Sequence, residues 1–173
     1  MARILMVIAP VNFRDEELFV PKEFFESKGI EVDVASLVKT PVAGMLGKTA
    51  TPDLLVSEVL IDDYDAVVFV GGIGVEDRKL YENSEVLNLA KTAFSRGKAV
   101  AAICIAPKIL AAAGLLRNRK ATVFSSGREY IVEKGAEYSK EEAVRDGTIV
   151  TASGPSSAKR FAELVYGLIG GKS

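Results

Sequence analysis

The one cysteine of the chain, Cys104, stands where its sulfur could act as a nucleophile. The apolar run Val100–Ile103 before it is long enough for one buried strand. Pro107 suits the first turn of a helix, and Gly114 suits the position just past a helix end. The sequence therefore predicts a sharp strand-to-helix turn that carries Cys104, which is the arrangement of a nucleophile elbow.

A second interpretation of Cys104 stays open, because a single cysteine in an apolar segment is often a small buried core residue. The predicted turn argues for chemistry, since the N-terminus of a helix favours a nearby anion such as a thiolate. From its position alone, we give the core interpretation about the same weight as the reactive one.

Two carboxylates could reach the same region. Glu17 begins the first predicted helix, directly after a predicted strand, and Glu76 begins a later helix. A carboxyl beside a thiolate has a raised pKa and can donate a hydrogen bond to the sulfur. Glu76 could serve the same cleft or that of a neighbouring subunit. Both acids could equally be ordinary helix-start residues that interact with the helix dipole.

The loop Gly71-Gly72-Ile73-Gly74 follows a predicted strand. It lacks the G-x-G-x-x-G spacing of a dinucleotide site, and two acids follow it where a phosphate would lie. The backbone N–H groups of Gly71 and Gly72 could instead bind an oxyanion next to the cysteine. A plain glycine turn explains the same residues.

The chain contains no histidine. This excludes a Ser-His-Asp triad, a Cys-His pair and a histidine-ligated metal, so proton transfer would fall to a carboxylate, lysine, tyrosine or the thiolate. One cysteine without histidine also makes a zinc site unfavourable. We therefore expect no metal and no cofactor.

Composition indicates a single domain over residues 1–173 that folds in the cytoplasm. The formal net charge is -1, so nucleic acid is not an electrostatically favoured partner. A lone cysteine fits a reducing compartment. No apolar run reaches the roughly 18 residues of a membrane span, so we expect no membrane partner.

The positioning elements follow from apolar runs and breakers. Strands are predicted at 4–9, 32–34, 66–70, 100–103, 121–124 and 148–152, a hairpin within 37–60, and a small antiparallel piece within 136–147. Helices are predicted from residues 15, 107, 128 and 155, and another between the glycine loop and Gly97, with Leu80, Leu87, Ala90 and Phe94 on one stripe. The alternation predicts an α/β sandwich around a mostly parallel sheet. Ligands of such sheets bind at the carboxyl ends of the strands, which brings Gly71, Gly72 and Cys104 together.

The motifs together resemble the ThiJ/PfpI superfamily. The resemblance rests on residues 101–107 (AAICIAP) and 113–116 (AGLL), supported by 17–21, 67–72 and 146–155. It implies a flavodoxin-like three-layer sandwich and a homodimer or larger homo-oligomer. It also implies that Cys104 is the nucleophile, that Glu17 hydrogen-bonds the thiol, and that Gly72 and Ile105 offer backbone N–H groups. Glu76 matches a glutamate that reaches a neighbouring subunit's site.

The chain departs from the superfamily at both histidine positions. Ile105 stands where one branch has histidine after the cysteine, and Phe124 stands near the histidine of another branch. Loss of an orienting base from a nucleophile pair usually costs several orders of magnitude in rate.

Three functions remain after the sequence alone. The leading hypothesis is a thiolate protein that uses Cys104 with Glu17 to respond to peroxide or to act on small electrophiles, in the manner of a glyoxalase or deglycase. The second is a weak intracellular cysteine peptidase or amidase. The third is an oligomeric binding protein without catalysis.

Overall fold

The computed structural model describes residues 2–170, and seven strands form its main sheet in the order β10-β11-β7-β6-β1-β2-β5. The neighbours run parallel, except that β10 is antiparallel to β11. The strands are β1 (Arg3–Val7), β2 (Glu31–Ser36), β5 (Leu54–Leu55), β6 (Ala66–Phe69), β7 (Ala99–Ile103), β10 (Ala143–Asp146) and β11 (Ile149–Ala152).

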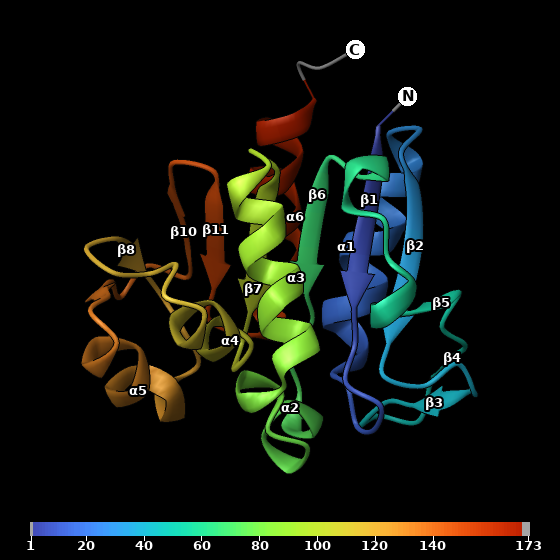
Figure 1. The fold of residues 1–173 in the computed structure, drawn as a ribbon, viewed down its shortest axis with the longest axis horizontal. Helices are drawn as coiled ribbons and strands as arrows, with labels where there is room; N and C mark the ends of the chain where they lie inside the picture. Colours follow the sequence, from blue (N-terminus) through green and yellow to red (C-terminus); the bar gives the residue numbers. More distant parts are fainter. Residues whose placement is uncertain (1, 171–173) are drawn as a thin grey trace.

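Helices cover both faces of this sheet, so the predicted three-layer α/β sandwich is confirmed. Figure 1 shows α3 and α4 in front of the sheet and α1 and α6 behind it. The helices are α1 (Asp15–Ser27), α2 (Ile73–Asp77), α3 (Ser84–Ser95), α4 (Pro107–Ala112), α5 (Arg128–Glu133) and α6 (Ala158–Ile169).

The core lies on the two faces of the sheet because the central strands are apolar at every position. In β1, Leu5 and Val7 belong to the core on one face, whereas Ile4 and Met6 belong to the core on the other. Successive side chains of a strand point to opposite faces, so a continuous apolar run is what a doubly covered parallel strand requires.

The expected long helical pattern after the glycine loop is divided into separate elements. Asn83 caps α3 by accepting a hydrogen bond from the backbone N–H of Val86 (3.1 Å), so the helix begins there. Leu80 lies in a separate 3-10 turn before the helix. Leu80 and Ala90 of the predicted stripe are buried, and Leu87 and Phe94 are partly buried against the same core. The buried positions of α3 are Val86, Leu89, Ala90 and Ala93.

The predicted strand 121–124 is also mostly wrong. Only Lys120–Ala121 forms β8, which pairs in parallel with β9 (Glu137–Tyr138) in a small separate sheet. The next residues bond elsewhere: the N–H of Thr122 donates to Thr151 Oγ1 (3.0 Å), and that of Phe124 donates to the carbonyl of Cys104 (2.7 Å). The segment is thus tied to the main sheet and the cysteine turn.

The predicted hairpin within 37–60 is present as β3 (Val42–Ala43) and β4 (Thr49–Ala50), paired antiparallel. Figure 1 places it beside α2 at the end of the sheet where β1 and β6 finish. The sequence missed β5, a two-residue edge strand directly after Pro52 and Asp53.

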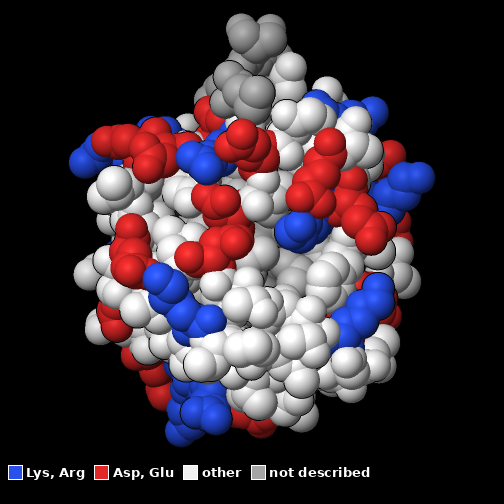
Figure 2. All heavy atoms as spheres, turned by 90° about the vertical axis from the view of Figure 1, so that its right-hand side faces the viewer, with Lys and Arg blue, Asp and Glu red and all other residues white. Residues whose placement is uncertain are grey.

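Charges of both signs are interspersed on the side of the molecule that carries β5, and Figure 2 shows most of them in the upper half of that view. Acidic and basic residues are nearly equal in number, 23 against 22. Within residues 2–170, no helix combines the length and apolar character that crossing a membrane would need.

Candidate active site

Cys104 lies on the turn between β7 and α4, as the sequence predicts. Its φ is +64°, a left-handed conformation that is costly for a side chain other than glycine. The turn is held at both ends of the residue: the Cys104 N–H donates to the carbonyl of Ala152 (2.8 Å), and its own carbonyl accepts from Phe124. The scaffold thus fixes the position of the sulfur.

Glu17 reaches the same place from the first turn of α1. Its side chain is fully buried, and Oε1 accepts a hydrogen bond from the backbone N–H of Gly71 (3.0 Å). The second oxygen, Oε2, is buried and has no hydrogen-bond partner among residues 2–170. Burial raises the pKa of Glu17 to about 8, although Cys104 and the Gly71 N–H oppose the rise. The carboxyl is therefore protonated at neutral pH.

Burial also raises the pKa of the Cys104 thiol to about 12, and the neighbouring Glu17 carboxylate adds to the rise. The backbone N–H groups of Ile105 and Gly72 act in the opposite direction. We expected the N-terminus of the helix to favour the thiolate, but burial has the larger effect on the pKa and favours the thiol. Because the two acids interact, their protons are lost in steps that belong to the pair, and the first step lies near pH 8.

Gly71 brings Glu17 and Cys104 together because it has no side chain. A Cβ there would lie 2.5 Å from Glu17 Oε1, 2.6 Å from the carbonyl oxygen of Ile103 and 2.7 Å from the Cys104 Cβ. One prediction for this residue needs correction. The Gly71 N–H binds the Glu17 carboxyl rather than an oxyanion, which leaves Gly72 and Ile105 as the amides that act on the sulfur.

The sulfur opens into a cleft of about 530 Å³. The two residues that the resemblance matched to histidines lie on its wall: Ile105 is buried, and Phe124 is 44% exposed. The lining residues are Arg14, Met45, Gly72, Ile73, Glu76, Asp77, Cys104, Ile105, Phe124, Ser126 and Pro155.

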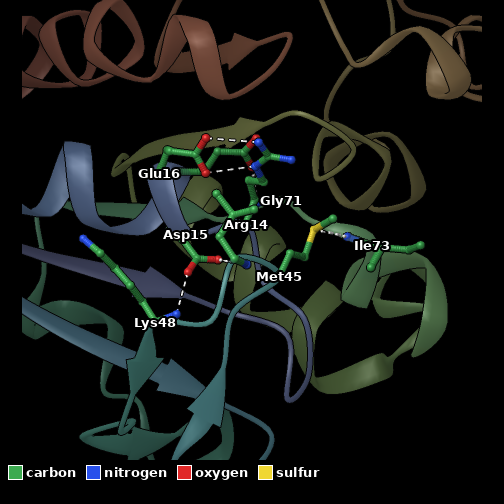
Figure 3. A network of polar contacts seen from close by, with 9 residues as sticks. Arg14, Asp15, Glu16, Met45, Lys48, Gly71 and Ile73 are labelled. Carbon is green, nitrogen blue, oxygen red and sulfur yellow. Dashed lines mark hydrogen bonds and ion pairs between the residues drawn. The ribbon is translucent and has the colours of Figure 1, made fainter.

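One wall of this cleft comes from the β3–β4 hairpin, which the sequence did not connect with the site. The buried Asp15 carboxylate accepts the backbone N–H groups of Leu46 and Lys48, both at 2.9 Å. Met45 lies in the loop of the same hairpin, and its sulfur accepts the N–H of Ile73 (3.4 Å). Figure 3 shows Asp15 joined to Lys48 and Met45 turned towards Ile73. No local pattern in the sequence distinguishes Asp15 from its acidic neighbours Glu16 and Glu17.

Arg14 is a second residue that the sequence did not single out. Its Nε and Nη2 donate to the carboxylate of Glu16 at 2.9 and 3.1 Å, as Figure 3 shows. Glu16 and, more weakly, Cys104 raise the pKa of Arg14. The guanidinium that lines the cleft is therefore paired with the first turn of the helix that follows it.

Glu76 lines the cleft of its own chain, and its role in a neighbouring subunit's site stays a prediction. Its Oε1 accepts a hydrogen bond from Lys108 Nζ (2.8 Å). Lys108 belongs to α4, the helix after the cysteine turn.

Comparison of the sequence with known proteins identifies the family to which the chain belongs. The sequence matches the DJ-1/PfpI family over residues 2–167. The chain belongs to the DJ-1/PfpI family. The deglycase PfpI of Pyrococcus furiosus is 34% identical to it over 151 residues, covering 87% of this chain and 90% of that protein. An uncharacterized protein of Methanocaldococcus jannaschii is 44% identical over 162 residues, covering 92% of this chain and 78% of its relative.

The solved structures give the same result. The ThiJ/PfpI domain protein from Brachyspira murdochii superimposes with a TM-score of 0.95 at 38% identity, covering 99% of this chain and 98% of that one. The flavodoxin-like fold expected from the resemblance is therefore confirmed for this DJ-1/PfpI protein.

Proposed function

We propose that this DJ-1/PfpI protein acts on small reactive aldehydes, in a deglycase-like or glyoxalase-like reaction that uses Cys104 and Glu17. The Cys104 sulfur bonds to the carbonyl carbon, and the C=O π electrons move to the oxygen. One proton passes from the Cys104–Glu17 pair to that oxygen, which gives a hemithioacetal. For a 2-oxoaldehyde, later addition of one water gives the 2-hydroxy acid overall.

The observation that carries this proposal is the orphaned Oε2 of Glu17. A buried oxygen without a hydrogen bond is costly, and a proton on Oε2 would let it donate to the neighbouring Cys104 sulfur. With a pKa of about 8, Glu17 can take up or release a proton near neutral pH, which is what acid–base catalysis needs. The deglycase name of the Pyrococcus relative supports the same class of reaction.

The peptidase alternative is less well supported. The two residues that the resemblance matched to histidines, Ile105 and Phe124, present apolar side chains to the cleft, so the Cys104 sulfur has no imidazole to remove its proton. The peroxide hypothesis remains a prediction. Thiolate is the species that peroxide oxidises, so a raised Cys104 pKa argues for slow oxidation at neutral pH.

The test is turnover of methylglyoxal, and of an amine that carries a methylglyoxal adduct, followed as 2-hydroxy acid formed and free amine released. We expect turnover by the wild type, none by Cys104→Ala, and a rate at least about tenfold lower for Glu17→Gln. Glu23→Gln, an exposed glutamate on the same helix, is the matched control and should match the wild type. Equal turnover by the wild type and Cys104→Ala, or no turnover of either substrate, would overturn the proposal.

A further inference from the structure

Lys108 is a buried lysine in the first turn of α4, and only 7% of the residue is exposed. Its Nζ lies 4.1 Å from the ring centroid of Tyr81 and 4.7 Å from that of Tyr130. The two ring centroids are 5.4 Å apart. Aromatic faces attract a cation, so the two rings hold the ammonium group in one place.

The same ammonium group is paired with a carboxylate of the cleft. Lys108 Nζ donates to Glu76 Oε1 at 2.8 Å, and the Glu76 side chain is 41% exposed while that of Lys108 is 9% exposed. Glu76 also contributes to the raised pKa of Tyr81, so its carboxylate lies beside the phenol as well. A molecule that enters the cleft therefore meets the carboxylate before the buried cation.

Stability alone gives a weak reason for this arrangement. A buried ion pair is often no more stabilising than apolar side chains of the same volume, because both charges lose water. The pair does fix an orientation, since Glu76 extends from the five-residue helix α2 to a rigid partner in α4. Asp77, the next residue, also lines the cleft but has no ion pair within the part of the chain that the structure describes.

We infer that Lys108 is a positioning residue that fixes the Glu76 carboxylate in the Cys104 cleft of its own chain, where Glu76 favours molecules carrying a cationic or N–H-donating group. The other full charges of the lining are consistent with this selectivity. The guanidinium of Arg14 is already paired with Glu16, and Asp77 is a second carboxylate. The inference rests on the proposed function in one respect: Cys104 must react with electrophiles that enter this cleft.

The test uses Cys104 as its own reporter, because the chain has no other cysteine. The protein is treated with two methanethiosulfonates, one bearing a trimethylammonioethyl group and one a sulfonatoethyl group. The thiolate displaces methanesulfinate and forms a disulfide with the reagent's sulfur. The measured quantity is the ratio of the cationic to the anionic rate constant in the wild type, Glu76→Gln, Lys108→Met and the double variant.

A change of sign separates positioning from plain electrostatics. Removal of the positive charge of Lys108 should by itself raise the cationic-to-anionic ratio. If Lys108 positions Glu76, Lys108→Met instead lowers the ratio by about threefold or more, towards that of Glu76→Gln. In the Glu76→Gln background, where nothing remains to be positioned, the same substitution leaves the ratio unchanged or raises it.

Asp77→Asn is the matched control, and Lys108→Met should lower the ratio in that background as it does in the wild type. Thermal unfolding checks that each variant is folded, and Lys108→Gln replaces Lys108→Met if the latter is not. Equal effects of Lys108→Met with and without Glu76 would overturn the inference. Labelling with the expected ratios but without aldehyde turnover would overturn only the proposed function. Absence of labelling by either reagent would overturn both.

Discussion

Glu17 and Cys104 hold their acidic groups beside each other, one from the first turn of α1 and the other from the turn after β7, where the sulfur meets the cleft. Their pKa values are both raised, to about 8 and about 12, and burial is the largest cause for each. The pair therefore keeps both protons at neutral pH and gives up one of them near pH 8. The reactivity of the sulfur depends on where the remaining proton lies.

Glu17→Gln should change how the alkylation rate of Cys104 depends on pH. In the wild type, the rate with neutral iodoacetamide should rise only well above neutral pH, because burial raises the pKa of Cys104 to about 12 and the Glu17 carboxylate adds to the rise. Glutamine carries no charge, so the contribution of the carboxylate is lost and the midpoint should move downward. At a pH below the midpoint, the rate should then increase about tenfold for a shift of one pKa unit.

Glu23→Gln serves as the control for this experiment, because it removes an exposed carboxylate from the same helix. Its profile should superimpose on that of the wild type. Identical profiles for Glu17→Gln and the wild type would show that the carboxyl is not coupled to the thiol.

The stability of the wild type should fall as pH rises from about 4.5 to about 8. The folded pKa of Glu17 is raised from 4.5 to about 8, so in this window the folded state binds more protons than the unfolded state. The free energy of unfolding then decreases with pH. Urea unfolding across the window should show this slope in the wild type and a smaller one in Glu17→Gln. A slope that is equal in both proteins would contradict the assignment.

Gly71→Ala should damage both stability and the site. The added Cβ meets Glu17 Oε1, the Ile103 carbonyl and the Cys104 Cβ at 2.5 to 2.7 Å, and the backbone carbonyl of Ile103 cannot move aside easily. We expect a loss of about 3 kcal/mol in the free energy of unfolding and a shifted alkylation profile. Gly167→Ala in α6, where a Cβ has open space, should instead stabilise by about 0.5–1 kcal/mol. Chemical denaturation measures both.

Asp15→Asn should loosen the hairpin that forms one wall of the cleft. One carboxylate oxygen becomes an NH₂ group that opposes the backbone N–H of either Leu46 or Lys48. The expected cost is about 1–3 kcal/mol, as for other buried donors left without an acceptor. Limited proteolysis should then cut within residues 42–50 faster than in the wild type. Unchanged cleavage of the hairpin would show that Asp15 does not hold it.

The sequence was sufficient for the fold class because the buried strands are apolar at every position, as in Ile4–Val7 and Ala66–Phe69. Its errors fall where partners distant in the chain decide the structure. The strand expected at 121–124 ends after Ala121, because Thr122 and Phe124 bond to Thr151 and Cys104 instead.

The site shows the same limit. Strand-to-helix turns and glycines are local signals, so the positions of Cys104, Glu17 and Gly72 could be predicted. The Lys108–Glu76 pair and the Asp15 contacts could not, since each joins elements whose spatial relation is set by the complete sheet. Burial was the largest physical omission, because the local turn gave no indication that it would outweigh the helix N-terminus at the sulfur.

The loop at residues 71–73 also provides reporters of the site. The amide of Gly71 is bound to Glu17, that of Gly72 acts on the Cys104 sulfur, and that of Ile73 is bound to Met45. In a nitrogen-15 NMR spectrum, the chemical shifts of three consecutive residues would separately follow the protonation of the acid, the state of the thiol and the contact of the hairpin. The chemistry of the cleft could thus be observed in the unmodified protein, without substituting any of the side chains involved.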